Sequence, residues 1–120
     1  MVNQGMLTVY VTDLERSVKF YSDVLGMTVK MHFPGHYAQV EIKGLTIGLH
    51  PTSPKSPKAG NSESLSIGLS VEDIHSEMKL LIDKGVNFSG DVIDDVQILL
   101  AFFKDPDGNP LYLAQSKMKW

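Results

Sequence analysis

A chain of 120 residues with 42% hydrophobic and 21% charged residues is long enough for one globular domain of ordinary composition. Its formal charge of −3 and its calculated pI near 5.7 argue against a nucleic-acid-binding surface, which needs a concentrated basic face. The chain contains no cysteine, so disulfides, thiolate metal sites and cysteine nucleophiles are excluded.

The expected compartment follows from two features that the sequence lacks. No apolar run approaches the roughly 20 residues that a membrane-spanning helix requires. The segment MVNQGMLTVYV at the N-terminus has neither the basic region nor the small-residue cleavage site of a signal peptide. We therefore expect a cytoplasmic protein without nucleic-acid or membrane partners.

The first half of the chain predicts a strand, a helix and three further strands. Apolar residues alternate over 6–11, a period of two that is typical of a strand with one buried face. Thr12 and Glu15 match a capping box, so a helix is predicted to begin there and to end at Gly26. The strand-like runs that follow are MTVKMHF (27–33), YAQVEI (37–42) and LTIGLH (45–50).

The same order of elements is predicted again from residue 65. A strand over 65–71 leads into a helix with an imperfect capping box at Ser70 and Asp73, and Gly85 is predicted to end this helix. Apolar residues of the two helices match at an offset of about 60 residues, which predicts an internal duplication. The later segments are VNF (86–88) as a short strand, DVIDDV (91–96) as an acidic loop, and VQILLAFF (96–103) and PLYLA (110–114) as strands.

The segment PTSPKSPKAGNSES (51–64) separates the two halves. Three prolines, four serines and no large apolar residue predict a surface linker. We therefore expect a single domain over 1–120, in which repeat 1 covers about 5–50 and repeat 2 covers about 65–115.

Two segments resemble the vicinal oxygen chelate superfamily, which includes glyoxalase I, fosfomycin- and bleomycin-resistance proteins and extradiol dioxygenases. VTDLERSVKFYSDVLGM (11–27) is similar to the end of that family's first strand and its helix, and FFKDPDGNPLYL (102–113) is similar to its final hairpin. The resemblance implies an α+β fold, in which two βαβββ repeats form a cup-shaped mixed sheet with helices on the convex face. It also implies a homodimer. It does not name the reaction, because this scaffold hosts several chemistries and plain binding.

The run KDPDGNP (104–110) predicts a turn between the last two strands, because proline fixes φ and glycine adopts positive φ without steric cost. We expect Asp105 and Asp107 to form this turn through hydrogen bonds to nearby backbone N–H groups, and not to act in catalysis.

Strand alternation predicts which side chains turn away from the helices and line the concave face. Polar and aromatic residues are frequent in this set, as expected for a small-molecule binding cleft and not for a packed core. The predicted ligand-binding residues are Met6, Thr8, Tyr10, Tyr37, Gln39, Glu41, Gly48, His50, Ser66 and Tyr112.

The metalloenzymes of the superfamily bind a divalent ion through four His or Glu side chains, one on each of four strands. The resemblance places these ligands at Met6, Ser66, Tyr112 and Gly48, or at His50 if the fourth strand is shifted by two residues. A thioether, a hydroxyl, a phenol and a glycine do not replace imidazole and carboxylate ligands. We therefore expect no metal and no cofactor.

Several residues of the predicted cleft have two interpretations. Glu41 is either a desolvated base or clamp for a cationic ligand, or a solvated residue near a hairpin. His50 either contacts a ligand or lies on the rim. Tyr10, Tyr37 and Tyr112 either hold planar or cationic groups, or are core aromatics whose hydroxyls reach water.

Three functions are compatible with these features. The first is a metal-independent small-molecule binding protein, like the bleomycin-resistance branch, that holds a ligand in the concave cleft. The second is an enzyme, either a glyoxalase-like lyase or isomerase with an atypical, rearranged metal site, or a metal-free catalyst that uses Glu41, His50 or Tyr112. The third is a non-binding regulatory or structural module whose cup is filled by its own side chains.

Overall fold

The computed structural model describes residues 1–60 and 62–118, and the chain divides into two compact units, Met1–Asn61 and Ser62–Trp120. Each unit has the order strand, helix, three strands, so the predicted α+β class with two βαβββ repeats is confirmed. Unit 1 contains β1 (Leu7–Val11), α1 (Leu14–Lys19), the π-helical η1 (Phe20–Val24), β2 (Thr28–Phe33), β3 (Tyr37–Ile42) and β4 (Leu45–Pro51). Unit 2 contains β5 (Ile67–Ser70), α2 (Ile74–Asp83), β6 (Ile93–Asp94), β7 (Ile98–Lys104) and β8 (Pro110–Ser116).

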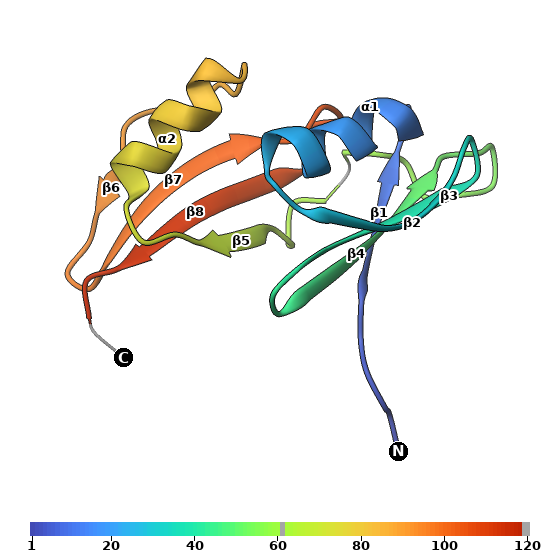
Figure 1. Cartoon of the computed structure of the whole chain (residues 1–120), viewed down its shortest axis with the longest axis horizontal. Coiled ribbons are helices and arrows are strands. Elements are labelled where there is room, and N and C mark those ends of the chain that lie inside the picture. Colours follow the sequence, from blue (N-terminus) through green and yellow to red (C-terminus); the bar gives the residue numbers. More distant parts are fainter. Residues whose placement is uncertain (61, 119–120) are drawn as a thin grey trace. The chain divides into compact units, whose positions relative to one another are not determined.

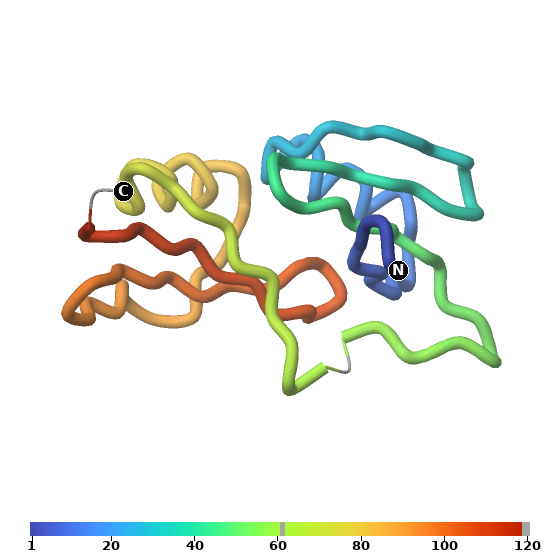
Figure 2. The backbone as a smooth tube through the Cα atoms, turned by 90° about the horizontal axis from the view of Figure 1, so that it is seen from below, coloured from blue at the N-terminus to red at the C-terminus, as the bar shows by residue number. Residues whose placement is uncertain are grey.

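Each unit forms its own four-stranded mixed sheet, in the order β1-β4-β3-β2 in unit 1 and β5-β8-β7-β6 in unit 2 (Figure 1). The first strand of each repeat pairs in parallel with the last, and the other neighbours are antiparallel, as for the adjacent β7 and β8 in Figure 2. Thr8 lies opposite Gly48 in unit 1, and Gly68 lies opposite Tyr112 in unit 2. Gly48 and Tyr112 are therefore equivalent positions of the two repeats.

One helix covers one face of each sheet, and the core of each unit lies between them. The π-helical turn η1 continues α1, which packs on β3 and β4, while α2 packs on β7 and β8. Alternate residues of the strands fill these cores, as the period of two predicts. The buried apolar residues are Val9, Val11, Leu14, Val18, Tyr21, Met27, Ala38, Val40, Ile47 and Leu49 in unit 1, and Ile67, Ile74, Leu81, Val86, Ala101, Phe103, Leu111 and Leu113 in unit 2.

The helix starts differ from the predicted capping boxes. Asp13 is the N-cap of α1 and accepts a hydrogen bond from the backbone N–H of Arg16 at 3.1 Å. Asp73 is the N-cap of α2 and accepts one from the backbone N–H of Ser76 at 3.2 Å, which lowers the pKa of this carboxyl. Aspartate serves as well as serine or threonine at this position. The two capping aspartates lie 60 residues apart, which matches the predicted offset.

The first helix ends in a wide turn that the sequence pattern does not predict. In η1 the backbone N–H of Leu25 donates to the carbonyl of Phe20 at 3.0 Å, five residues back, which is the spacing of a π-helix. The predicted glycine stops are confirmed, since Gly26 has φ 80° and Gly85 has φ 97°.

Two expectations for unit 2 are wrong. VNF (86–88) is a loop and not a strand. Its apolar side chains pack into unit 2 while its backbone joins no sheet: Val86 is buried, and Phe88 lies against Phe103 at a ring-centroid distance of 5.3 Å. The strand lies instead in the acidic segment, where Ile93–Asp94 pairs with β7 as β6. The strand predicted from 65 begins at Ile67, and the residue before it in the apolar pattern, Leu65, is exposed.

Candidate functional site

A row of aromatic side chains crosses the helix-free face of the unit 1 sheet. Tyr10 on β1 lies opposite His50 on β4, and Tyr37 on β3 lies opposite Phe33 on β2. The ring of His50 contacts both neighbouring tyrosines, with centroid distances of 5.6 Å to Tyr10 and 6.3 Å to Tyr37. Phe33 is 55% exposed, so the row is accessible to solvent. Flat rings with polar edges suit the binding of planar molecules.

A second row beside it centres on Gly48. Thr8 and Gln39 lie opposite this glycine on the two neighbouring strands. A β-carbon at Gly48 would meet the hydroxyl of Tyr37 at 2.5 Å and Cε of Met6 at 3.2 Å. The glycine therefore lets Tyr37 lean across β4, and the tyrosine and methionine fill the space above it.

Gln39 holds the phenol of Tyr37 in this position. Its Nε2 donates a hydrogen bond to the hydroxyl oxygen of Tyr37 at 3.0 Å and contacts Sδ of Met6 at 4.0 Å. Since the phenol oxygen accepts from the amide, its own hydrogen points elsewhere. The pair therefore presents a hydrogen-bond donor beside the aromatic row.

Glu41 lies one row further along the same face, opposite Thr46 on β4 and Thr28 on β2. It is half-buried, and the ion pairs seen in residues 1–60 and 62–118 do not involve it. Glu41 precedes the hairpin turn at Lys43–Gly44 by two residues. Its role as a base or clamp for a ligand and its role as a solvated residue both stay predictions.

The helix-free face of unit 2 repeats the combination of a tyrosine and a glycine. A β-carbon at Gly68 on β5 would collide with Cζ and Oη of Tyr112 on β8, so this phenol lies flat on the strand. Phe102 on β7 packs on the other side of Tyr112 at a centroid distance of 5.8 Å. Ser66 precedes β5 and is exposed.

Eight of the ten predicted ligand-binding residues therefore belong to unit 1, where they gather on one sheet face or directly precede it. Ser66 and Tyr112 belong to unit 2, and their convergence with the others stays a prediction. The eight are Met6, Thr8, Tyr10, Tyr37, Gln39, Glu41, Gly48 and His50.

The positions that the resemblance assigns to metal ligands do not fit a metal. Met6, Ser66 and Tyr112 offer a thioether, a hydroxyl and a phenol, and Gly48 offers no side chain. Zn²⁺, Mn²⁺, Fe²⁺ and Ni²⁺ sites in proteins are built mainly from imidazole, carboxylate and thiolate groups, and this chain has no cysteine. One of these positions is also filled, because the phenol of Tyr37 covers Gly48. Within the described residues no three His, Asp or Glu side chains are grouped as metal ligands would be.

The turn at 104–110 is held by Asp105, as predicted. This carboxylate is only 5% exposed, and its Oδ1 accepts hydrogen bonds from the backbone N–H groups of Asp107 at 2.9 Å and Asn109 at 2.8 Å. Its Oδ2 accepts from the side-chain amide of Asn109 at 2.9 Å. Asp107 contributes its backbone N–H to this turn. The turn is therefore structural, and it positions the start of β8, the strand that carries Tyr112.

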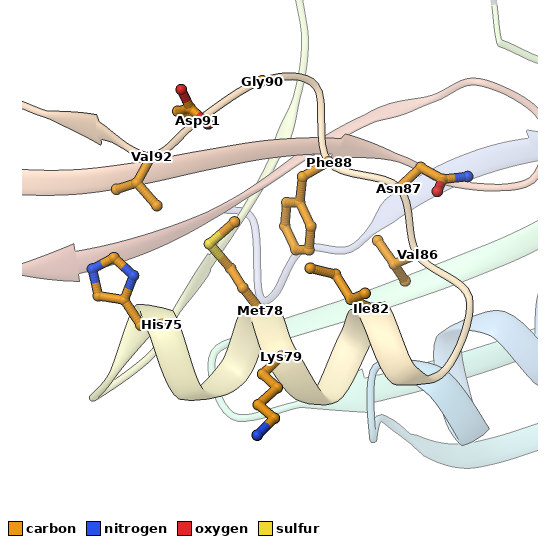
Figure 3. A pocket seen from close by; sticks show the side chains of 10 residues that line it. All are labelled: His75, Met78, Lys79, Ile82, Val86, Asn87, Phe88, Gly90, Asp91 and Val92. Carbon is orange, nitrogen blue, oxygen red and sulfur yellow. The ribbon is translucent and has the colours of Figure 1, made fainter.

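A groove that sequence reasoning missed runs along α2 in unit 2 (Figure 3). It has a volume of about 780 Å³, with an apolar floor from the helix and from the loop at 86–92. Met78 and Ile82 of α2 face Phe88 and Val92 of the loop, while Lys79 points away from it. The sequence gives one signal for this groove: Ile82 extends the apolar spacing of Ile74 and Met78 along the helix, and the structure leaves it 53% exposed.

No helix within the described residues has the length and apolar character that crossing a bilayer requires.

Comparisons with known proteins agree on one family. The model of the Glyoxalase/Bleomycin resistance protein/Dioxygenase superfamily matches residues 3–113. A curated relative, "Probable lactoylglutathione lyase" of Synechocystis sp., is 33% identical over 122 residues, covering 91% of this chain and 92% of the relative. Among solved structures, TnmS3, an antibiotic binding protein from Streptomyces sp. CB03234, is 29% identical with a TM-score of 0.74, covering 97% of this chain and 98% of that one. An integron cassette protein from the mobile metagenome of V. cholerae is 26% identical with a TM-score of 0.71, covering 96% and 97%.

Proposed function

Because the chain belongs to the glyoxalase/bleomycin resistance protein/dioxygenase superfamily, we propose that it is a metal-independent binding protein for a small planar molecule. The observation that carries this proposal is the aromatic row of Tyr10, His50, Tyr37 and Phe33 on the helix-free face of unit 1. A planar ligand stacked on this row would bury apolar surface against ring faces, and an electron-poor or cationic ring would be favoured by the tyrosines.

The residues at the family's metal-ligand positions support binding without a metal. A thioether, a hydroxyl, a phenol and a glycine leave nothing to polarise a substrate oxygen through a divalent ion. The antibiotic-binding neighbour in Streptomyces shows that a protein of this fold and similar length can serve as a binder. For this chain the ligand would lie in the predicted concave cleft, beside Thr8, Gln39 and Glu41.

We expect a thermal-shift screen of planar aromatic and cationic compounds to yield ligands that raise the unfolding temperature. A ligand at 100 times its Kd stabilises the folded state by about 2.7 kcal/mol. Tyr10→Ala and Tyr37→Ala should each weaken the binding of such a ligand about tenfold, since loss of an aromatic contact costs roughly 1.4 kcal/mol or slightly more once its buried area is included. Titration calorimetry measures the affinities.

Ile82→Ala is the control for this experiment, because Ile82 lies in the groove of unit 2 and not on the sheet face. The Ile82→Ala variant should bind the ligand with the same affinity as the wild type. If Ile82→Ala weakens binding and the tyrosine variants do not, the ligand occupies the groove and the proposed site is wrong. If no compound stabilises the protein, the non-binding module is favoured instead.

The alternative function is a glyoxalase-like lyase or isomerase, and the 33% identical lactoylglutathione lyase relative is the observation that favours it. It would be supported by one equivalent of a divalent ion in protein purified without chelators, together with turnover of lactoylglutathione. It would be excluded if the protein produced no turnover either alone or with added Mn²⁺, Ni²⁺ or Zn²⁺.

We also propose that the protein is a cytoplasmic homodimer, an inference that rests on the family resemblance. Light scattering should then give twice the 13.3 kDa of one chain. A mass equal to one chain at micromolar concentration would contradict the dimer and leave the binding site on the unit 1 sheet unaffected.

A further inference from the structure

We infer that His50 determines the specificity of the proposed site, by accepting a hydrogen bond at Nε2 from an O–H or N–H group on the edge of the planar ligand. This inference rests on the proposed function. It specifies the ligand further: a planar molecule that carries a hydrogen-bond donor on its rim.

The hydrogen bond of His50 to its own backbone neighbour defines its tautomer. Nδ1 lies 2.8 Å from the carbonyl oxygen of Pro51. A carbonyl oxygen only accepts hydrogen bonds, so Nδ1 must carry the hydrogen and donate it. In the neutral ring Nε2 then bears the lone pair and is an acceptor.

The acceptor is available to a ligand. His50 is exposed, and no group within residues 1–60 and 62–118 donates to its Nε2. Its Nδ1 bond holds the ring in one orientation, so the acceptor is oriented before a ligand arrives. Preorganised polar groups lose less conformational entropy on binding than mobile ones.

The neighbours of His50 on this face of the sheet are two aromatic rings. Tyr10 and Tyr37 flank the imidazole at 5.6 Å and 6.3 Å, with interplanar angles of 51° and 62°. A planar ligand stacked on one of these tyrosines would bring its edge toward the imidazole. The phenol hydrogen of Tyr37, which the hydrogen bond from Gln39 does not use, suits a ligand acceptor.

This arrangement predicts discrimination between a donor and its methylated analogue. A site that aligns an acceptor with a ligand hydroxyl binds the analogue without that hydrogen less tightly, because one hydrogen bond is lost. The expected ratio is about tenfold, the size of one net hydrogen bond.

The test compares 2-naphthol with 2-methoxynaphthalene, which share a planar ring and differ in the donor hydrogen. Calorimetric titration measures the Kd of each probe for the wild type, His50→Phe and His50→Gln. In His50→Phe, which keeps a ring in the row but has no acceptor, the preference for 2-naphthol should fall about tenfold. His50→Gln, whose side-chain oxygen can accept, should regain part of the preference. The matched control is His36→Phe, in the turn between β2 and β3, which should retain the wild-type ratio.

The outcomes separate this inference from the proposed function. If both probes bind and His50→Phe leaves their affinity ratio unchanged, the role of His50 is overturned while the binding function stands. If neither probe binds the wild-type protein, the inference about His50 is overturned, and the thermal-shift screen decides separately whether the binding function stands. Circular dichroism shows whether His50→Phe folds. If it does not fold, His50→Ala replaces it, and the preference for 2-naphthol should be lost in that variant. An unchanged affinity ratio of the two probes in His50→Ala would also contradict the role of His50.

Discussion

Replacing Asp105 with alanine is expected to destabilise the protein by about 2–4 kcal/mol, because two partly buried backbone N–H groups lose their acceptor. Oδ1 of this carboxylate accepts from Asp107 and Asn109, and Oδ2 accepts from the side chain of Asn109. An alanine offers none of these oxygens, and the 5% exposure of the site leaves little room for water to replace them. Urea unfolding followed by circular dichroism measures the free energy of unfolding.

Two variants test the reason for this loss. Asp105→Asn keeps one carbonyl oxygen for the two backbone donors and should therefore lose clearly less stability than Asp105→Ala. Asp91→Ala removes an exposed aspartate outside the turn and should change stability by no more than about 0.5 kcal/mol. Equal losses for alanine and asparagine at position 105 would contradict a role as hydrogen-bond acceptor.

The second large effect is expected at Gly68. An alanine there would place its β-carbon against Cζ and Oη of Tyr112, and Cε2 of that ring is 2.8 Å away. The ring would have to leave its position between β5 and Phe102, so we expect Gly68→Ala to cost about 1–3 kcal/mol, the usual cost of overpacking. The same denaturation measurement applies.

A double-mutant cycle identifies the source of this cost. In a Tyr112→Ala background the added methyl group meets no ring, so Gly68→Ala should be nearly neutral there. Gly5→Ala is the control, because a β-carbon at Gly5 has no atom within 4 Å. Equal costs of Gly68→Ala in both backgrounds would show that the backbone of β5, and not the phenol of Tyr112, requires glycine.

The sequence predicts the faces of the sheets well because strand geometry alone decides them. Side chains in a strand alternate strictly between its two faces. One face of these strands is buried and carries Val9, Val11, Val40 and Ile47. The residues between them must therefore lie on the opposite face, and these include Tyr10, Gln39 and Gly48. The same reasoning fails where alternation stops. Leu65 continues the apolar pattern of its segment but lies before β5, and it is 65% exposed.

The contacts within the site could not be predicted, because they join residues that are distant in the chain and depend on side-chain rotamers. Tyr37 leans across the strand onto Gly48, and Gln39 reaches back to its hydroxyl. The tautomer of His50 depends on a single backbone carbonyl, that of Pro51. Alternation places these residues on one face but says nothing about which of them touch.

The wrong prediction of a strand at 86–88 has a similar cause. Phe88 packs its ring on Phe103 and does not pair with the sheet.

The π-helical turn at Phe20–Val24 marks a difference in length between the two repeats. The capping aspartates, Asp13 and Asp73, are 60 residues apart, whereas the glycines that end the helices, Gly26 and Gly85, are 59 apart. The first copy therefore has one residue more between cap and stop. A π-helical turn spans one residue more than an α-helical turn, so η1 accounts for the additional residue of repeat 1 within the helix itself.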